Sequence, residues 1–535
     1  MLTSAGRFAA ASSIACAAGW SVERVTPASR LFGANGLRNG PDGRLYVAQV
    51  SGSQISAIDV ASGAVHTVSP MGGAIVAPDD IAFDSEGNLF ATEISEGRVS
   101  VRSPNGQSRV VYGDLPCANP ITIHQGRLFA GECLHRGRIV ELDLNGRPPR
   151  VLVENVPMPN AMEVGPDGRL YFPVMEANEI WRVGLDGGAP EVVARNLGVP
   201  DSVKFDQHGF IVSTQAASGE VLRINPETGE HSTLAQLAPG LDNLAFVDGR
   251  LFVSSFSGAI TEILAGGTTR SLLPAGMNGP LGLTCEPDGR VLVCDGPYCY
   301  CVHRGARPEV LGMLFTPGSP GYSRGIVFAA PGEYIITTGL GQVARWRPAQ
   351  QASEILAEGF DRLFGVDVDA RGAAIVAEAG RGRLLGIFKG KVAELASGLD
   401  EPRGVAVTDD GDYLVAEQGA GRVVRVTPGG VETVLDGLQC PQGIACRGAF
   451  LYVMDAGSRS LVQYNCVSKD RQTVATELPV GHPAGVTPKP IRPFPPLSGA
   501  MGPFADIALA ADGRLYIAAD AEGSVVALRC DDQAT

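Results

Sequence analysis

The sequence contains no long apolar run and carries little positive charge. No stretch of about eighteen consecutive apolar residues occurs, which leaves no candidate for a membrane-spanning helix. Lysine and arginine together number 43 against 57 aspartate and glutamate residues, and the formal net charge is −14. Proteins that bind nucleic acid need a basic face for the phosphates. We therefore expect neither a membrane nor a nucleic acid as a partner.

The chain also lacks the short motifs of several enzyme classes. It contains no Gly-x-Ser-x-Gly nucleophile elbow, no P-loop and no dinucleotide-binding fingerprint. Any chemistry that the protein performs has to come from a different arrangement of residues.

Eleven cysteines are scattered along the chain, several of them within apolar runs. We expect reduced, partly buried thiols in a cytoplasmic protein. The spacing leaves open a zinc site at Cys294, Cys299 and Cys301 with His303 as the nearby imidazole, although paired Cys-x-x-Cys knuckles are absent. Export is the alternative localisation, but Met1–Trp20 is poor in the leucine that secretory signals favour.

Glycine, proline and short apolar runs are abundant. The chain contains 69 glycines and 37 prolines, yet 44% of its residues are hydrophobic. An apolar run, an Asp-Gly turn and a second apolar run recur, as in Gly40–Ala48, Gly165–Phe172 and Ala511–Ala518. Glycine supplies the positive φ of a hairpin turn, and Leu-Tyr-Val is a strand sequence. The pattern predicts many short antiparallel strands, and no helical periodicity competes with it.

The turn repeats twelve times, in steps that are mostly about 40 residues long. The turn glycines are Gly43, Gly87, Gly126, Gly168, Gly209, Gly249, Gly289, Gly332, Gly372, Gly411, Gly448 and Gly513. Four strands in such a step are typical of a β-propeller blade, and twelve blades exceed what one ring usually holds. We therefore predict an all-β protein of two tandem six-bladed β-propellers with four-stranded blades. The first propeller is expected at residues 30–275 and the second at residues 276–535.

The twelfth unit is one strand short. Its strands are expected at Asp506–Ala510, Leu515–Ala519 and Ser524–Leu528. Because an open sheet edge is unfavourable, we predict that the unassigned run Val22–Val25, within an N-terminal strand at residues 21–28, completes the second propeller. The Pro-rich insertion Leu478–Pro503 is expected on the mouth side of the second propeller, as a surface loop or a lid.

One position carries Asn or Asp in six consecutive units of the first half. It lies seven or eight residues before each turn glycine and begins the innermost strand of its blade. The six residues are Asn35, Asp79, Asn119, Asn160, Asp201 and Asp242. Innermost strands surround the channel of a propeller, so these side chains are expected to converge at one mouth. Converging carboxylates repel one another unless protons or a cation intervene, and oxygen ligands suit Ca²⁺, Mg²⁺ or Mn²⁺.

A structural origin of this pattern is the alternative, because Asn and Asp also satisfy backbone N–H groups before a strand. The second half offers a comparison within the same chain. Its corresponding residues are Leu281, Arg324, Phe364, Arg403, Gln442 and Ala505. None of them is acidic, so the turn itself does not require Asn or Asp. The two arginines either make the second mouth mildly cationic or form salt bridges.

The second strand of each blade runs antiparallel to the first and ends at the same mouth. In the first half the residues at that end are Gln49, Glu93, Glu132, Val174, Gln215 and Ser255, with Glu176 just beyond. His135 lies in a loop at this mouth, as a candidate general base or an exposed surface residue. The first mouth is thus predicted to be crowded with carboxylates and amides.

The segment Pro159–Tyr171, followed by Pro200–Gly209, resembles the senescence marker protein / gluconolactonase / luciferin-regenerating enzyme family. The resemblance implies a six-bladed propeller that binds one divalent cation at the channel mouth through a Glu, two Asn and an Asp. Members of that family are mostly lactone or ester hydrolases. Its ligand pattern matches Asn119, Asn160 and Asp201 here. The repeat also looks like the broader NHL-type propellers, many of which are binding modules.

The chain departs from that family in the first blade, where Asn35 stands in place of the Glu. The missing charge could come from Asp79, Asp242, Glu93 or Glu132. The resemblance covers the first half, whereas the second half is similar only at the level of the fold.

Together these observations predict a metal-dependent hydrolase of a lactone or related cyclic ester, with a small-molecule substrate at the first mouth. The expected metal ligands are Asn119, Asn160, Asp201, Asp79 and Asp242. The expected proton acceptors are Asp201, Glu93 and Glu132. The expected substrate contacts are Asn35, Gln49, Gln215 and His135. A non-enzymatic ligand- or protein-binding propeller and a metal-assisted lyase or isomerase are the alternatives, and the sequence leaves the substrate and the oligomeric state open.

Overall fold

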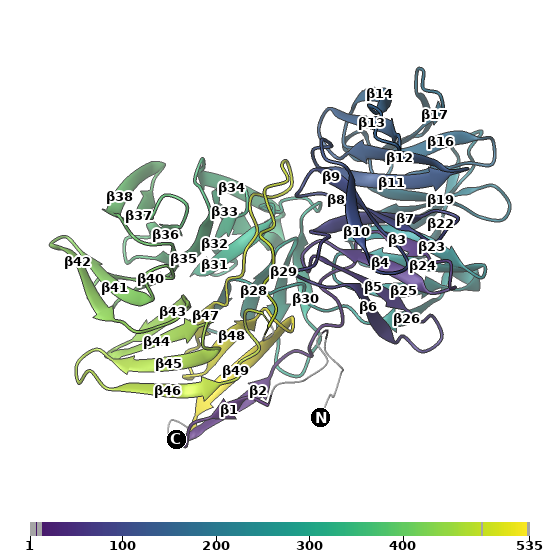
Figure 1. Ribbon diagram of the computed structural model, residues 1–535. Coiled ribbons are helices and arrows are strands. Elements are labelled where there is room, and N and C mark those ends of the chain that lie inside the picture. Colours follow the sequence, from purple (N-terminus) through teal and green to yellow (C-terminus); the bar gives the residue numbers. More distant parts are fainter. Residues whose placement is uncertain (1–6, 8–12, 483–484, 532–535) are drawn as a thin grey trace. The chain divides into compact units, whose positions relative to one another are not determined.

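The computed structural model of the protein describes residues 7, 13–482 and 485–531. These residues form twelve antiparallel sheets, of which eleven have four strands and one has five (Figure 1). They contain no α-helix, only the short 3-10 turns η1 (Met175–Ala177), η2 (Ala265–Gly267) and η3 (Pro348–Gln350). The predicted all-β fold of two tandem six-bladed propellers is confirmed. Within the described residues no helix is long and apolar enough to cross a membrane.

The chain divides into two compact units, which we call the first and the second propeller. The first consists of Arg30–Gly276 together with Gly485–Pro496. The second consists of the described residues among Met1–Ser29, Met277–Ala484 and Leu497–Thr535. The second propeller is therefore assembled from three separate pieces of the sequence.

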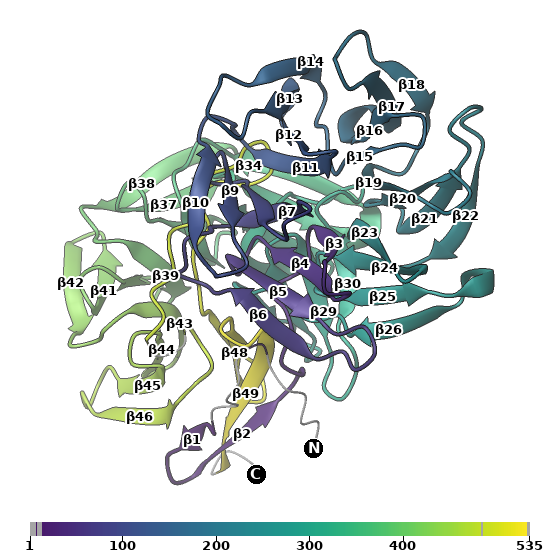
Figure 2. The ribbon, with the colours of Figure 1, turned by 45° about the vertical axis from the view of Figure 1, so that its right-hand side comes forward.

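The first propeller contains six four-stranded sheets in chain order, and Figure 2 shows their innermost strands around a common centre. Its strands are β3 (Leu37–Asn39), β4 (Leu45–Gln49), β5 (Gln54–Ile58), β6 (Val65–Ser69), β7 (Pro78–Phe83), β8 (Leu89–Glu93), β9 (Arg98–Arg102), β10 (Ser108–Tyr112), β11 (Ala118–His124), β12 (Arg127–Glu132), β13 (Gly137–Leu142), β14 (Arg150–Val156), β15 (Glu163–Val164), β16 (Arg169–Val174), β17 (Glu179–Gly184), β18 (Glu191–Ala194), β19 (Pro200–Phe205), β20 (Ile211–Gln215), β21 (Glu220–Ile224), β22 (His231–Gln236), β23 (Leu241–Val247), β24 (Arg250–Ser255), β25 (Ile260–Ile263) and β26 (Thr269–Leu273).

The second propeller contains the other six sheets and the two N-terminal strands. Its strands are β1 (Ala15–Cys16), β2 (Trp20–Arg24), β27 (Leu283–Cys285), β28 (Val291–Asp295), β29 (Tyr298–Val302), β30 (Glu309–Met313), β31 (Ser323–Ala330), β32 (Glu333–Thr338), β33 (Val343–Arg347), β34 (Ala352–Ala357), β35 (Leu363–Val368), β36 (Ala374–Glu378), β37 (Arg383–Phe388), β38 (Lys391–Ser397), β39 (Pro402–Val407), β40 (Tyr413–Glu417), β41 (Arg422–Thr427), β42 (Gly430–Leu435), β43 (Pro441–Arg447), β44 (Phe450–Asp455), β45 (Ser460–Asn465), β46 (Arg471–Thr476), β47 (Ile507–Leu509), β48 (Leu515–Ala519) and β49 (Ser524–Cys530).

The turn between the first two strands of a blade requires glycine. Gly43 has φ of 76°, in the left-handed region, and its N–H donates to the Gly40 carbonyl over 3.1 Å. All twelve turn glycines identified from the sequence have positive φ. A residue with a Cβ is strained in this conformation, which explains why the glycine recurs in every blade.

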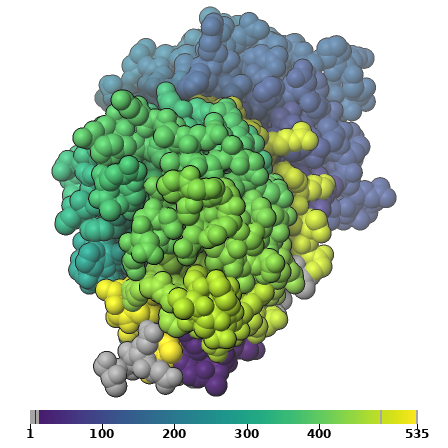
Figure 3. Space-filling view, turned by 90° about the vertical axis from the view of Figure 1, so that its left-hand side faces the viewer, coloured from purple at the N-terminus to yellow at the C-terminus, as the bar shows by residue number. Residues whose placement is uncertain are grey.

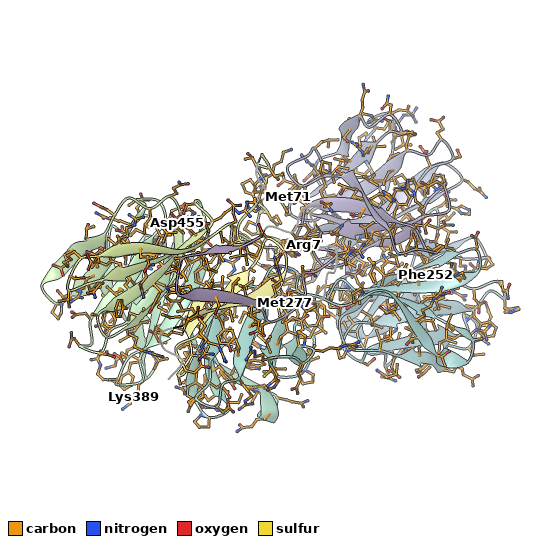
Figure 4. The ribbon with its side chains drawn as sticks, turned by 90° about the horizontal axis from the view of Figure 1, so that it is seen from below. Arg7, Met71, Phe252, Met277, Lys389 and Asp455 are labelled. Atoms are coloured by element: carbon orange, nitrogen blue, oxygen red, sulfur yellow. The ribbon has the colours of Figure 1, made fainter. Side chains whose placement is uncertain are left out.

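The first propeller closes through side-chain packing between its first and sixth sheets. Leu37 and Val47 of the first sheet share one buried cluster with Ala245 and Phe252 of the sixth, and Figure 4 marks Phe252. Hydrogen bonds also join the two sheets at this seam, such as the one that Ser254 Oγ donates to the Asn35 carbonyl over 2.7 Å.

The second propeller closes through its N-terminal strand. β2 pairs with β49 from Trp20 opposite Cys530 to Arg24 opposite Val526, and so forms the fourth strand of the last sheet. This is the pairing expected for Val22–Val25, and Figure 3 shows the purple N-terminal residues beside the yellow C-terminal ones. β1 adds a fifth strand to the preceding sheet by pairing with β46. Arg7, marked in Figure 4, donates from Nε to the Ala521 carbonyl over 3.0 Å.

Candidate functional site

The six Asn and Asp residues singled out in the first half occupy equivalent positions in their blades. Asp79, Asn119, Asp201 and Asp242 are each the second residue of the innermost strand, in β7, β11, β19 and β23. Asn35 and Asn160 lie just before β3 and β15. We call these six residues the mouth ring. Apart from the half-buried Asn35, all of them are buried, and Asp201 is 1% exposed.

Neighbouring blades hold the backbone of the mouth ring in place. Thr92 Oγ1, on the second strand of one blade, donates to the carbonyl of Asn119 in the next blade over 2.6 Å. Thr214 Oγ1 donates to the Asp242 carbonyl in the same way. Within the ring, Asn35 Nδ2 donates to Asp242 Oδ2 over 3.0 Å. The ring residues are therefore positioned by the contacts that join the blades.

A second set of polar residues lies one step deeper in the channel. These residues, which we call the channel layer, are Arg38, Asp80, Glu163, Lys204 and Asn243. Arg38 Nη1 of the first blade donates to Glu163 Oε2 of the fourth over 2.8 Å, and Asn243 Nδ2 of the sixth donates to Asp80 Oδ1 of the second over 3.3 Å. These contacts join blades that are not neighbours, so the innermost strands do converge on one axis.

The charges of the channel layer compensate one another. Glu163 contacts both Arg38 and Lys204, whose Nζ lies 3.1 Å away. Burial alone would raise the pKa of Glu163, but the two cations overcome that effect and hold its pKa at about 2. Sequence reasoning missed this layer. Its signal was Arg38, Glu163 and Lys204 three residues after a mouth-ring residue, where a filled channel would take small or apolar side chains.

The carboxylates of the mouth ring, in contrast, form no ion pair with a lysine or arginine in the part of the chain that the structure describes. Burial, aided by the neighbouring Asp80, raises the pKa of Asp79 to about 8. Burial raises the pKa of Asp201 well above its usual range, and the charges of Asp79 and Asp80 add to the effect. The pKa of Asp242 is raised by burial and by Asp201 and Asp79, while the hydrogen bond from Asn35 opposes the shift. The ring therefore favours either bound protons or a bound cation.

Two members of the mouth ring present buried oxygen atoms that no protein donor satisfies. Both carboxylate oxygens of Asp201 lack a hydrogen-bond partner among the described residues, and so does Oδ1 of Asn119. Asn160, in comparison, uses Oδ1 to accept from the Ala161 N–H over 2.8 Å, and Asn35 Oδ1 accepts from the Val50 N–H over 3.1 Å. Unsatisfied buried oxygens are costly, and their chemistry fits a hard divalent cation.

The geometry limits how such a cation would be held. Within the described residues no three His, Cys, Asp or Glu side chains stand close enough together to hold a metal ion. Carboxylates alone therefore do not form the site, and the amide oxygens of the asparagines would have to take part. The same finding leaves the zinc site expected at Cys294, Cys299 and Cys301 without support. Cys294 and Cys299 face each other across β28 and β29, with 3.8 Å between their sulfur atoms.

Residues at the end of the second strand make structural contacts that the sequence analysis did not anticipate. The carboxylate of Glu93 accepts from the Val76 N–H over 2.7 Å and pairs with Arg98 at 2.7 Å. The same contact, to an N–H seventeen residues earlier, recurs in both propellers. We call the residues that make it the strand-end clasp: Gln49, Glu93, Gln215, Asp295, Glu378 and Glu417.

Their hydrogen-bonding capacity is taken up by the fold. Gln49 and Gln215 are fully buried and also donate to Ser56 and Ser213, each over 2.9 Å. Glu132 accepts from the N–H and Nε of Arg138 over 3.1 and 3.0 Å. The roles predicted for Glu93, Glu132, Gln49 and Gln215 in catalysis or substrate binding stay predictions, and the structure shows these side chains bonded to their own blades.

His135 remains exposed and pairs through Nδ1 with Glu176 Oε1. Its side chain is 66% exposed and that of Glu176 is 34% exposed. Asn160 Nδ2 contacts the sulfur of Met175 at 3.2 Å, immediately before Glu176. The pair therefore lies at the rim of the mouth ring and is free to meet a ligand.

Part of the Pro-rich insertion belongs to the first propeller, not to the second as its place in the sequence indicated. Residues 485–496 group with the first propeller. Cys117 Sγ, two residues before Asn119, donates to the Pro495 carbonyl over 3.1 Å, and Arg492 lies 3.5 Å from Glu96. The rest of the insertion contacts the second propeller. Residues 483–484 lie outside the described part.

Comparison with known proteins identifies no family for this chain. No protein-family profile matches the sequence, and no curated protein sequence matches it. Among solved structures, streptogramin B lyase is similar over 51% of this chain and 94% of its own, with 20% identity and a TM-score of 0.39. The nidogen/laminin complex (43% and 93% coverage, 20% identity, TM-score 0.38) and a gluconolactonase from Xanthomonas campestris (44% and 86%, 15%, 0.39) are also similar. All three similarities are distant.

Proposed function

We propose that the mouth ring of the first propeller binds a divalent cation and hydrolyses a lactone or related cyclic ester. The observation that carries this proposal is the pair of unsatisfied, buried carboxylate oxygens on Asp201, beside the unsatisfied amide oxygen of Asn119. Asp201, Asn119 and Asn160 would hold the cation, and Asp79 and Asp242 would supply the remaining negative charge. Ca²⁺, Mg²⁺ and Mn²⁺ all suit such oxygen ligands.

When bound, the cation would polarise the ester carbonyl and acidify a water molecule. The protein's own side chains would position the substrate and transfer protons. Asp79, whose pKa burial raises to about 8 in the protein alone, would release its proton when the cation binds, because a nearby positive charge favours the carboxylate. His135 and Glu176 contact the substrate from the rim, and residues 485–496 cover one side of the mouth near Cys117.

The test is an Asp201→Asn variant, which keeps the shape of the side chain but removes its charge. We expect the affinity for Ca²⁺, Mg²⁺ and Mn²⁺, measured by calorimetric titration, to fall about a hundredfold, and activity on a panel of small lactones to fall with it. The matched control is Asp367→Asn, because Asp367 is a half-buried carboxylate of the second propeller that accepts from the Val368 and Val407 N–H groups. Loss of metal in the control but not in Asp201→Asn would place the site elsewhere.

A non-enzymatic ligand-binding role is the second candidate. It is favoured by the contacts of Arg38 and Asn243 across the axis, which fill the channel below the ring, and by the structural engagement of Glu93 and Glu132. Metal binding without turnover of any lactone would support it. Reaction in ¹⁸O-labelled water separates the enzymatic alternatives, because a hydrolase incorporates solvent oxygen into the product and a lyase or isomerase does not.

A further inference from the structure

The second propeller carries cations where the first carries the mouth ring. Arg324 and Arg403 are the second residues of β31 and β39, and Phe364 is the second residue of β35 between them. Three consecutive blades thus present Arg, Phe and Arg at the positions that hold Asp79, Asn119, Asp201 and Asp242 in the first propeller. The equivalence follows from the strand register and not only from residue counting.

Both arginines are buried against the same aromatic ring. Arg324 is 1% exposed and Arg403 is 7% exposed. The guanidinium carbon of Arg403 lies 3.8 Å from the centroid of the Phe364 ring, and that of Arg324 lies 5.1 Å from it. Burial lowers the pKa of each arginine to about 10, so both remain charged at neutral pH. Two like charges are therefore held close together inside the protein.

The donors of these guanidinium groups are largely unsatisfied. Nη1 of Arg324, and Nε and Nη1 of Arg403, are buried and have no hydrogen-bond acceptor among the described residues. Arg324 Nη2 donates to the Ala500 carbonyl. In the described part of the chain, the carboxylate recorded within ion-pair distance is Glu401, 3.9 Å from Arg403. Its side chain is 41% exposed, and it also lies 3.8 Å from Arg362.

Apolar side chains lie beside these donors. Leu281, Phe364, Ala379 and Phe504 form a buried apolar cluster at this mouth, and Phe504 is fully buried. The insertion contacts Arg324 through the Ala500 carbonyl, and the neighbouring Gly499 N–H donates to the Gly339 carbonyl over 3.1 Å. A buried guanidinium without a counter-charge is costly, so this arrangement needs an acceptor that the protein does not provide.

We propose that the mouth of the second propeller binds a small oxyanion, a carboxylate or a phosphate, between Arg324 and Arg403. The planar fork of a guanidinium matches the paired oxygens of both groups, and charge-assisted hydrogen bonds of this kind are strong. Phe364 keeps the two forks apart and oriented. The site is independent of the cation site, because it belongs to the other propeller and takes a ligand of opposite charge.

The test is calorimetric titration of the whole protein with inorganic phosphate and, separately, with acetate and succinate. We expect saturable binding of at least one of them. Comparison of the affinity for phosphate with the affinities for acetate and succinate shows which of the two chemical groups the site prefers. Arg403→Gln and Arg324→Gln should each weaken binding about ten- to a hundredfold. Arg381→Gln is the control, because the side chain of Arg381 is 55% exposed. Absence of saturable binding to the folded protein, or equal loss in the control, would refute the proposal.

Hydrogen exchange of the unsubstituted protein locates the site even if the arginine variants do not fold. Bound anion should slow exchange in residues 499–505 and at the starts of β31 and β39, and leave β11 and β19 unchanged. Arg403→Lys keeps the charge but lacks the fork, so it should bind more weakly than the unsubstituted protein and more tightly than Arg403→Gln. Protection confined to the first propeller would show that the anion binds elsewhere and contradict the assignment.

Discussion

At the scale of single residues, the mouth ring could be predicted by counting back from the turn glycines. The structural role of the strand-end clasp could not be predicted in this way. Glu93 and Asp201 look alike in the sequence, since both are acidic residues at the same end of a blade. The comparison that distinguishes them lies within the chain. The second half has no acidic residue at the mouth-ring position, but it has Asp295, Glu378 and Glu417 at the clasp position. A feature shared by both propellers serves the fold, whereas a feature of one propeller is a candidate for function.

The clasp gives a prediction for Glu93. In Glu93→Gln the carboxylate that holds the Val76 N–H, Arg98 and Ser100 becomes a neutral amide, so we expect the free energy of unfolding to fall by about 2 kcal/mol. Metal affinity should not change. Urea unfolding and metal titration of the same sample measure both quantities, and a loss of metal without a loss of stability would return Glu93 to the site.

The channel layer gives a prediction for Glu163. Its pKa is about 2 in the folded protein and about 4.3 in an unfolded chain. A depressed pKa contributes stability that is present above the unfolded value and is lost as the pH falls towards 2. We expect Glu163→Gln to lower the free energy of unfolding by about 2 kcal/mol at pH 7, with a difference that shrinks below pH 5.

Urea unfolding from pH 7 down to about pH 2.5 measures this dependence. Glu191→Gln serves as the control, since Glu191 is an exposed partner of Arg169 and Arg182 and should leave the unfolding curve unchanged. A difference between Glu163→Gln and the unsubstituted protein that stays constant with pH would contradict the role given to the ion pairs. The layer escaped sequence reasoning because Arg38 and Glu163 stand 125 residues apart, on blades that meet only across the axis.

At the scale of elements, the sequence indicated nearly every strand because each one is bounded by a turn with its own chemistry. The blade hairpins have glycine at positive φ, and the strands between them alternate or are wholly apolar. The fifth strand, β1, has only two residues and no such signal. Likewise, the sequence of the Pro-rich insertion does not indicate that residues 485–496 pack with the first propeller. That assignment depends on contacts such as the one between Cys117 and Pro495.

The pairing of β2 with β49 predicts the effect of a truncation. Deletion of residues 1–28 removes both N-terminal strands and leaves the edges of β49 and β46 without partners. Amide hydrogen exchange should accelerate in the last two sheets of the second propeller, because an unpaired edge strand loses its hydrogen bonds. The first propeller should keep its protection and its metal affinity. Faster exchange in β3 to β26, with β43 to β49 unchanged, would show that the closure lies elsewhere.

At the scale of the whole molecule, the number of free thiols is a measure of the predicted reduced state of the cysteines. All eleven cysteines are free in the structure. The pKa of Cys285 and of Cys446 is raised to about 12, chiefly by burial, so these thiols are poor nucleophiles in the folded protein. Titration of the denatured protein should therefore count eleven thiols, and titration of the folded protein should count fewer. Recovery of disulfides from freshly purified protein would contradict a reducing compartment.

The division of the second propeller into three pieces of sequence has a consequence for the order in which the molecule can form during synthesis. β2 leaves the ribosome about five hundred residues before its partner β49, which at typical rates of synthesis is a delay of tens of seconds. Meanwhile β3 to β26 emerge together and can close their ring through adjacent blades. The nascent chain must therefore carry β2 unpaired until β49 has been synthesised. β2 is short and partly polar, with the sequence Trp-Ser-Val-Glu-Arg, and such a strand has a low tendency to aggregate while its edge is exposed to water.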